Sequence, residues 1–180
     1  ELSIDVPDEF MGIVIEQLLA RKEEGLQMLR RYLAETKDFK TPTVGAVLQA
    51  VARLEGAKVG GTVEKLLEHG DPDLRRIALF AYFSEPRDEA ELPRVIEFLN
   101  SKEGIFAQKR SLISLLAQKN VALFDIVFAE AETSIADEQI KEALRRTAEA
   151  VARRKAKGEA AAAKKAARAG QAAAPGPPPK

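Results

Sequence analysis

The fold is decided by residues 71–99, which read DPDLRRIALFAYFSEPRDEAELPRVIEFL. Asp71 and Pro72 open a helix, because an Asp side chain caps free N–H groups and proline suits the first helical turn. A Glu-Pro pair at 85–86 ends that helix, and a second amphipathic helix follows. Two such helices cannot bury their apolar faces alone, so the unit must stack on neighbouring units.

The same unit recurs along the chain. Its second helix carries an apolar triplet with i, i+3, i+4 spacing, which marks a buried helix face. Copies of the triplet follow one another at steps of 34, 32 and 29 residues. They are Leu29-Tyr32-Leu33, Val63-Leu66-Leu67, Val95-Phe98-Leu99 and Phe124-Val127-Phe128. Proline starts several of the first helices, at Pro7, Pro42 and Pro72.

The pattern predicts an all-α fold, an α-solenoid of about four to five helical hairpins with a disordered C-terminal tail. Three parts are expected: an extended N-terminal segment at 1–6, a helical repeat domain at 7–157, and a disordered Ala/Lys/Pro-rich basic tail at 158–180. The helices are expected at 8–20, 23–36, 42–55, 62–69, 72–84, 88–100, 104–118, 120–132 and 136–157.

Charge is divided between these parts. Residues 1–150 carry 27 acidic and 20 basic side chains, whereas residues 151–180 carry one acidic and eight basic side chains. The chain has no cysteine, which fits a reducing compartment and predicts a cytoplasmic location. No apolar run is long enough to span a membrane. The chain opens on Glu1 rather than Met, so we expect a domain of a larger protein.

The unit at 71–99 resembles a HEAT repeat of the armadillo-type helical family, in its short bacterial form. The features that carry the resemblance are the Asp-Pro start, the basic pair Arg75-Arg76, and the short turn into an apolar second helix. The basic position recurs at Lys109 and Arg110. The resemblance covers roughly residues 7–155 and implies a binding scaffold, because HEAT-like stacks are mostly binding proteins with unrelated partners.

In HEAT-like stacks the second helices line the concave face, so the resemblance implies a mixed-charge surface for a protein partner. The residues expected there are Gln27, Arg30, Arg31, Glu64, Lys65, Glu68, Arg94, Glu97 and Asn100. The first helix is apolar on more than one face. Phe10, Met11 and Ile15 are therefore expected to form an N-terminal interface with an upstream domain or a second copy of the chain.

No residue pattern indicates catalysis, a metal or a cofactor. The single histidine, His69, stands at a helix end, where the helix dipole explains it. Asp71 is explained as a helix cap, and Asp88 and Glu89 as first-turn charges that favour a helix N-terminus. We therefore expect a non-enzymatic adaptor, with a HEAT-like lyase-related enzyme as one alternative. The helix at 120–132 is apolar nearly all round, so it is either core or an exposed interaction stripe.

The basic tail raises a second alternative, a protein associated with nucleic acid. Clustered cations neutralise phosphates without reading sequence, and they also contact acidic surfaces or act as a solubilising linker. The residues in question are Arg153, Arg154, Lys155, Lys157, Lys164, Lys165 and Arg168.

Overall fold

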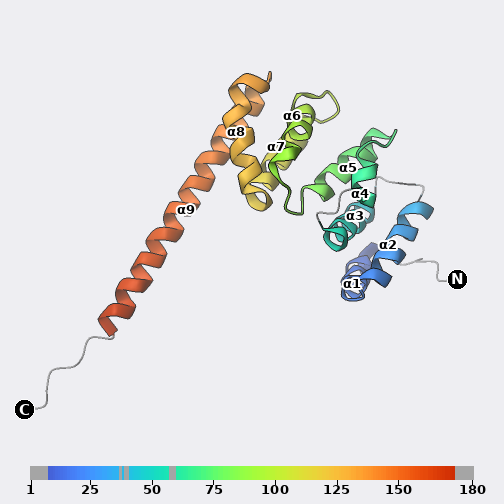
Figure 1. The fold of residues 1–180 in the computed structure, drawn as a ribbon, viewed down its shortest axis with the longest axis horizontal. Helices are drawn as coiled ribbons and strands as arrows, with labels where there is room; N and C mark the ends of the chain where they lie inside the picture. The colour runs from blue at the N-terminus through green and yellow to red at the C-terminus, as the bar shows by residue number, and fades with distance from the viewer. Residues whose placement is uncertain (1–7, 37, 39–40, 57–59, 173–180) are drawn as a thin grey trace, which may run out of the picture.

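The computed structural model describes residues 8–36, 38, 41–56 and 60–172, and over these residues the protein is all-α (Figure 1). The predicted extended segment at 1–6 lies outside the described residues. Nine α-helices and one short 3-10 helix are described. They are α1 (Asp8–Ala20), α2 (Glu23–Glu35), α3 (Pro42–Glu55), α4 (Thr62–Leu66), α5 (Pro72–Tyr82), η1 (Glu89–Glu91), α6 (Leu92–Asn100), α7 (Phe106–Lys119), α8 (Val121–Ser134) and α9 (Glu138–Ala172).

Helix starts follow the predicted capping chemistry. The side chain of Asp71 accepts hydrogen bonds from the backbone N–H groups of Asp73 (2.8 Å) and Leu74 (3.3 Å), and Pro72 occupies the first turn of α5. Asp88 accepts from the N–H of Ala90 at 3.0 Å and caps η1. The cap predicted at Asp71 is confirmed, whereas Asp88, predicted as a first-turn charge, is itself the capping residue of η1.

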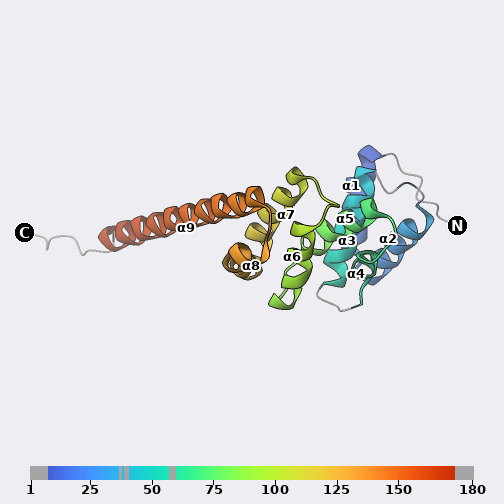
Figure 2. The ribbon, with the colours of Figure 1, turned by 90° about the horizontal axis from the view of Figure 1, so that it is seen from above.

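The helices fall into two packed groups. In the first, α3 packs against α1, α2, α4 and α5; in the second, α7, α8 and α9 pack against one another, and α6 and η1 lie on α8. None of the closely packed helix pairs in the described residues joins one group to the other. Figures 1 and 2 show the groups side by side along the long axis, with α1 and the free end of α9 at opposite ends.

The predicted apolar faces contribute to one hydrophobic core that runs through both groups. Val95 and Leu99 are fully buried and Phe98 is nearly so, which confirms this triplet. The triplet that begins at the buried Val63 is buried only in part, because α4 ends at Leu66. The helix at 120–132 combines both alternatives: its inner face is core, whereas Phe128 is 39% exposed.

A buried side chain, Asn120, connects the two groups. It is 4% exposed, its amide donates to the carbonyl oxygen of Phe83 (2.8 Å), and its side-chain oxygen accepts from the backbone N–H of Arg87 (2.5 Å). The Arg87 guanidinium lies 3.7 Å from the centre of the Tyr82 ring and donates to the carbonyl oxygens of Tyr82 (2.9 Å) and Gly56 (3.2 Å). The loop after α5 is thereby fixed to both groups.

The first group has its own polar connection at Glu55, the last residue of α3. This buried carboxylate accepts from Arg30 of α2 at 2.9 Å and from the backbone N–H groups of Thr62 (2.9 Å) and Val63 (3.5 Å), which begin α4. Burial raises the pKa of a carboxyl group, but the hydrogen bonds from Thr62, Arg30 and Val63 outweigh burial and lower the pKa of Glu55. Glu55 therefore holds three helices together in its charged form.

The N-terminal surface expected from the sequence is only partly present. Phe10 and Ile13 are exposed, at 51% and 60%, but Met11 (4%) and Ile15 (7%) lie in the core of the chain. The expectation that these two face outward is wrong, because α1 packs against α3 as well as α2 and so has two covered faces.

The last helix is longer than expected. The sequence predicts that this helix ends at 157 and that a disordered tail begins at 158, whereas α9 continues to Ala172. Alanine, lysine and arginine all have high helix propensity, and a helix that is already started pays no second nucleation cost. The remainder of the expected tail, residues 173–180, lies outside the described residues.

The two leucines of neighbouring triplets are expected to differ in their contribution to stability. Leu99→Ala should lower the free energy of unfolding by about 2–5 kcal/mol, since it leaves a closed cavity. Leu67→Ala should cost clearly less, because Leu67 is only partly buried. Urea unfolding followed by circular dichroism measures both, and equal losses would contradict the burial described above.

Replacing Glu55 should change how stability depends on pH. Glu55→Gln should cost about 1–3 kcal/mol at neutral pH, because charged hydrogen bonds are lost. The pKa of Glu55 is lower in the folded state than its ordinary value of about 4.3, so the contribution of the charge is complete above that value. It is lost as the pH falls through the lowered pKa. Urea unfolding at several pH values should show the two proteins converging in acid, and a constant difference would contradict this.

Candidate functional site

Three residues expected on the concave face come together at a pocket between the two helix groups. Glu68, Arg94 and Glu97 line this pocket, which has a volume of about 310 Å³. Arg75 and Arg76 of α5 line it as well. We call it the joint pocket. Of the nine residues expected on the concave face, only these three share a described pocket.

The other expected residues mostly serve the fold. Arg30 is bonded to Glu55, and the amide of Asn100 donates to the carbonyl oxygen of Ser134 (2.7 Å) while its oxygen accepts from the N–H of Ala136 (3.1 Å). The remaining contacts are local. Gln27 donates to Glu23, Arg31 pairs with Glu35, Glu64 accepts from the N–H of Gly60, and Lys65 is exposed.

The arginines of the joint pocket already have protein partners. Arg75 pairs with Glu103 and donates to the carbonyl oxygen of Gly70 (3.1 Å). Arg94 lies 3.5 Å from Glu91 and 5.4 Å from the centre of the Tyr82 ring, and its Nη1 atom is buried without a hydrogen bond to any described residue. The buried Nη1 faces protein, so no ligand reaches it directly. The arginines of the joint pocket therefore mainly form contacts within the protein.

Tyr82 takes part in the same set of internal contacts through its hydroxyl group and its ring. The hydroxyl group donates to Glu91 at 2.8 Å. Burial and the hydrogen bond to Glu91 raise the pKa of Tyr82 to about 12, so the phenol stays neutral at physiological pH. A neutral ring between Arg87 and Arg94 offers both cations its π face.

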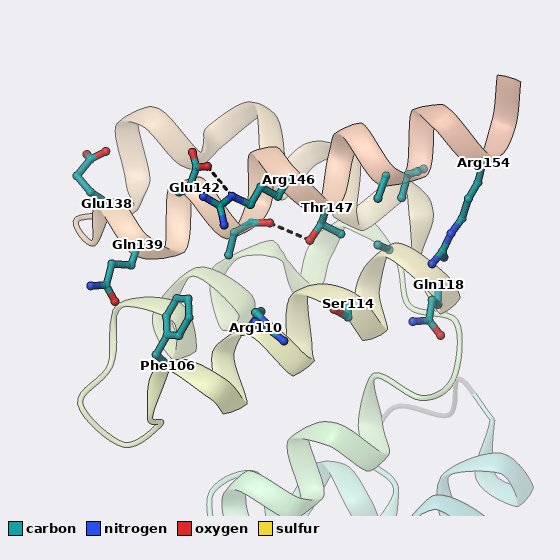
Figure 3. A pocket seen from close by; sticks show the side chains of 14 residues that line it. Phe106, Arg110, Ser114, Gln118, Glu138, Gln139, Glu142, Arg146, Thr147 and Arg154 are labelled. Atoms are coloured by element: carbon teal, nitrogen blue, oxygen red, sulfur yellow. Dashed lines mark hydrogen bonds and ion pairs between the residues drawn. The ribbon is translucent and has the colours of Figure 1, made fainter.

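A larger groove lies between α7 and α9, with a volume of about 650 Å³ (Figure 3). We call it the α7–α9 groove. Its apolar lining comes from small side chains and one aromatic ring, namely Ala117, Ala143, Ala150, Val151 and Phe106. Phe106 is 41% exposed at the start of α7. Polar groups lie around them, including Ser114, Gln118, Gln139 and Thr147.

Three arginines line the α7–α9 groove, and only one of them forms an ion pair with a described residue. Arg146 pairs with Glu142 at 2.7 Å. No hydrogen bond or ion pair joins Arg110 or Arg154 to another described residue. Figure 3 shows Arg154 extending from α9 toward the end of the groove where Gln118 lies. The groove therefore presents two available guanidinium groups beside an apolar lining.

A second depression of about 360 Å³ meets the α7–α9 groove at α7. It shares Arg110, Ser114 and Gln118 with the groove and reaches Phe80 of α5 and Gln49 of α3. The exposed face of α7 is therefore hollowed on both sides.

The α7–α9 groove was not predicted from the sequence, because the resemblance to HEAT repeats placed the binding surface on the second helices of the hairpins. A usable signal was present in the small residues at 143, 150 and 151, which leave room beside a neighbouring helix. Of the expected tail residues, Arg153, Arg154, Lys155 and Lys157 are exposed on α9. Lys164, Lys165 and Arg168 belong to the same helix, and their side chains are outside the described part.

The other candidates for chemistry have structural roles. Nδ1 of His69 accepts a hydrogen bond from the N–H of Asp71 at 3.1 Å, at the turn before α5. Within the described residues, no group of three His, Cys, Asp or Glu side chains is placed to hold a metal ion. None of the described helices is long and apolar enough to cross a bilayer.

The chain matches no model of a known protein family, no curated protein sequence and no solved structure. The resemblance to HEAT repeats therefore depends on the unit at 71–99 and on the period of the apolar triplets.

Substitution of Phe106 in the groove and of Phe124 in the core should have different effects on stability. Phe106→Ala should change the free energy of unfolding by less than about 1 kcal/mol, because Phe106 is 41% exposed and lies outside the buried core. Phe124→Ala should cost about 3–5 kcal/mol, because that ring is 1% exposed. Thermal or urea unfolding compares them, and a large loss for Phe106→Ala would mean that Phe106 belongs to the core.

Proposed function

We propose that this protein is a non-catalytic, HEAT-like α-solenoid that binds a protein partner in a larger assembly. The α7–α9 groove is the observation that carries the proposal. The solenoid interpretation draws support from packing between alternate helices, α1 with α3, α3 with α5, α6 with α8, and α7 with α9. Together with the recurring triplets, this is the packing expected of stacked helical hairpins.

The groove has the composition of a protein-binding surface. Its apolar lining includes the exposed ring of Phe106, and aromatic residues dominate the energy of protein interfaces. Hydrogen-bonding side chains, Ser114 and Gln118 among them, surround this lining. An apolar centre with a polar rim is the usual anatomy of an interface.

The proposal extends to the remaining expected surfaces. The joint pocket keeps Glu68 and Glu97 at its edge, where they are exposed to a partner that spans both helix groups. At the other end, Phe10 and Ile13 give α1 an exposed apolar strip that suits an upstream domain or a second protein.

Site-specific photo-crosslinking tests the groove as a binding surface. The full chain with p-benzoylphenylalanine at position 118 should give one adduct of defined mass in the native cell. A second substitution, Ala150→Glu, places a carboxylate on the groove lining and should reduce the adduct at least tenfold. The readout is the yield of the adduct on a denaturing gel.

The matched control is Ala129→Glu, which makes the same change at an exposed position of α8 that lines none of the described pockets. This variant should keep the adduct. Equal loss in both variants, or equal labelling from a probe placed at Ala122, would count against the groove as the site.

A further inference from the structure

Basic residues on α9 repeat at a spacing of eleven residues. Eleven residues make three turns at 3.67 residues per turn, close to the 3.6 of an α-helix, so positions eleven apart share a face. The pairs are Arg153 with Lys164, Arg154 with Lys165, and Lys157 with Arg168; Arg146 precedes Lys157 by the same step. Arg153 and Lys157 also lie one turn apart. One face of α9, which we call the basic stripe, therefore carries seven of the ten cations of this helix.

The first half of the stripe is visible in the described side chains. Arg146, Arg153, Arg154 and Lys157 line one shallow depression along α9, together with Glu149. Arg153 pairs with Glu149 at 3.1 Å. Arg154 and Lys157 have no ion-pair partner among the described residues, so their charges are available to a ligand.

The projection of α9 separates the stripe from the acidic body. Figure 2 shows α9 extending well beyond α8, and every residue from 152 to 162 is exposed. The 22 residues from Val151 to Ala172 span about 32 Å, at 1.5 Å for each of the steps between them. This length is several times the Debye length of about 8 Å at physiological salt. The negative charge of residues 1–150 therefore does not cancel the field of the stripe.

We propose that the basic stripe binds the phosphate backbone of duplex nucleic acid without reading its sequence. Beyond Val151 the helix has no apolar side chain larger than alanine, so it offers little hydrophobic contact to a protein or a bilayer. It has no aromatic ring on which unpaired bases would stack. Coulombic attraction remains, and a duplex is a rigid line of about one charge per 1.7 Å.

The test uses the full chain and a fluorescein-labelled 20-base-pair duplex DNA, with anisotropy measured between 25 and 150 mM NaCl. Six stripe cations lie beyond Val151, so the logarithm of affinity should fall against the logarithm of salt with a slope up to about −5, at about 0.9 per phosphate. The fourfold variant Arg153→Gln, Lys157→Gln, Lys164→Gln, Arg168→Gln should bind at least tenfold more weakly at 25 mM and reduce the slope to about −2. Glutamine keeps a similar helix propensity.

The matched control removes four charges away from the stripe: Lys65→Gln, Lys102→Gln, Lys119→Gln and Lys155→Gln, all at exposed positions. Its affinity should stay within about twofold of the parent protein. Equal weakening by both variants would overturn the proposal, because net charge alone would then explain binding.

Two further probes separate the classes of ligand. Polyglutamate and anionic phosphatidylserine vesicles should bind less tightly than the duplex; equal or tighter binding of either would overturn the proposal in favour of an acidic protein or a membrane. The stripe variant should retain the adduct from position 118, so failure of this inference is distinct from failure of the proposed function.

Discussion

The arrangement of this protein depends on one buried carboxamide, that of Asn120. A buried amide without partners costs several kilocalories per mole, so the loop after α5 must present the Phe83 carbonyl and the Arg87 N–H to it. Through this loop Arg87 also reaches Gly56 at the end of α3. This polar cluster therefore helps to set the position of the second helix group on the first, together with the Arg75–Glu103 ion pair and the hydrogen bond from Tyr82 to Glu91.

Local rules were sufficient for most of the helices. Proline starts, Asp caps and apolar spacing act over one or two turns, and the structure follows them at Asp71 and at Val95-Phe98-Leu99. Errors arose where the outcome depends on what packs nearby. Met11 and Ile15 are buried because α3 covers a second face of α1, which no local pattern reveals. The start of the tail was placed too early for the opposite reason, since α9 continues to Ala172 although its residues 152–162 are all exposed.

The candidate site was predicted less well than the fold. A groove forms where the side chains between two helices are too small to fill the space, and its position depends on how the helices pack. Residue patterns identify bulky apolar faces readily, whereas the α7–α9 groove exists because Ala143 and Ala150 leave space opposite α7. The polar residues expected on the concave face were assigned by analogy to other stacks. Several of them, including Arg30 and Asn100, are needed for internal hydrogen bonds that tertiary structure alone discloses.

The scarcity of close packing between the two helix groups has a mechanical consequence. Bending of an elongated molecule is resisted by the contacts that cross each section. Between the two groups these include the Phe80–Phe98 ring contact, the Arg75–Glu103 ion pair and the hydrogen bond from Tyr82 to Glu91. The joint pocket spans the section between the two groups, with Leu67 and Arg75 on one side and Arg94 and Glu97 on the other. Any bending at this section would therefore change the width of the joint pocket, whereas the α7–α9 groove lies within a single group.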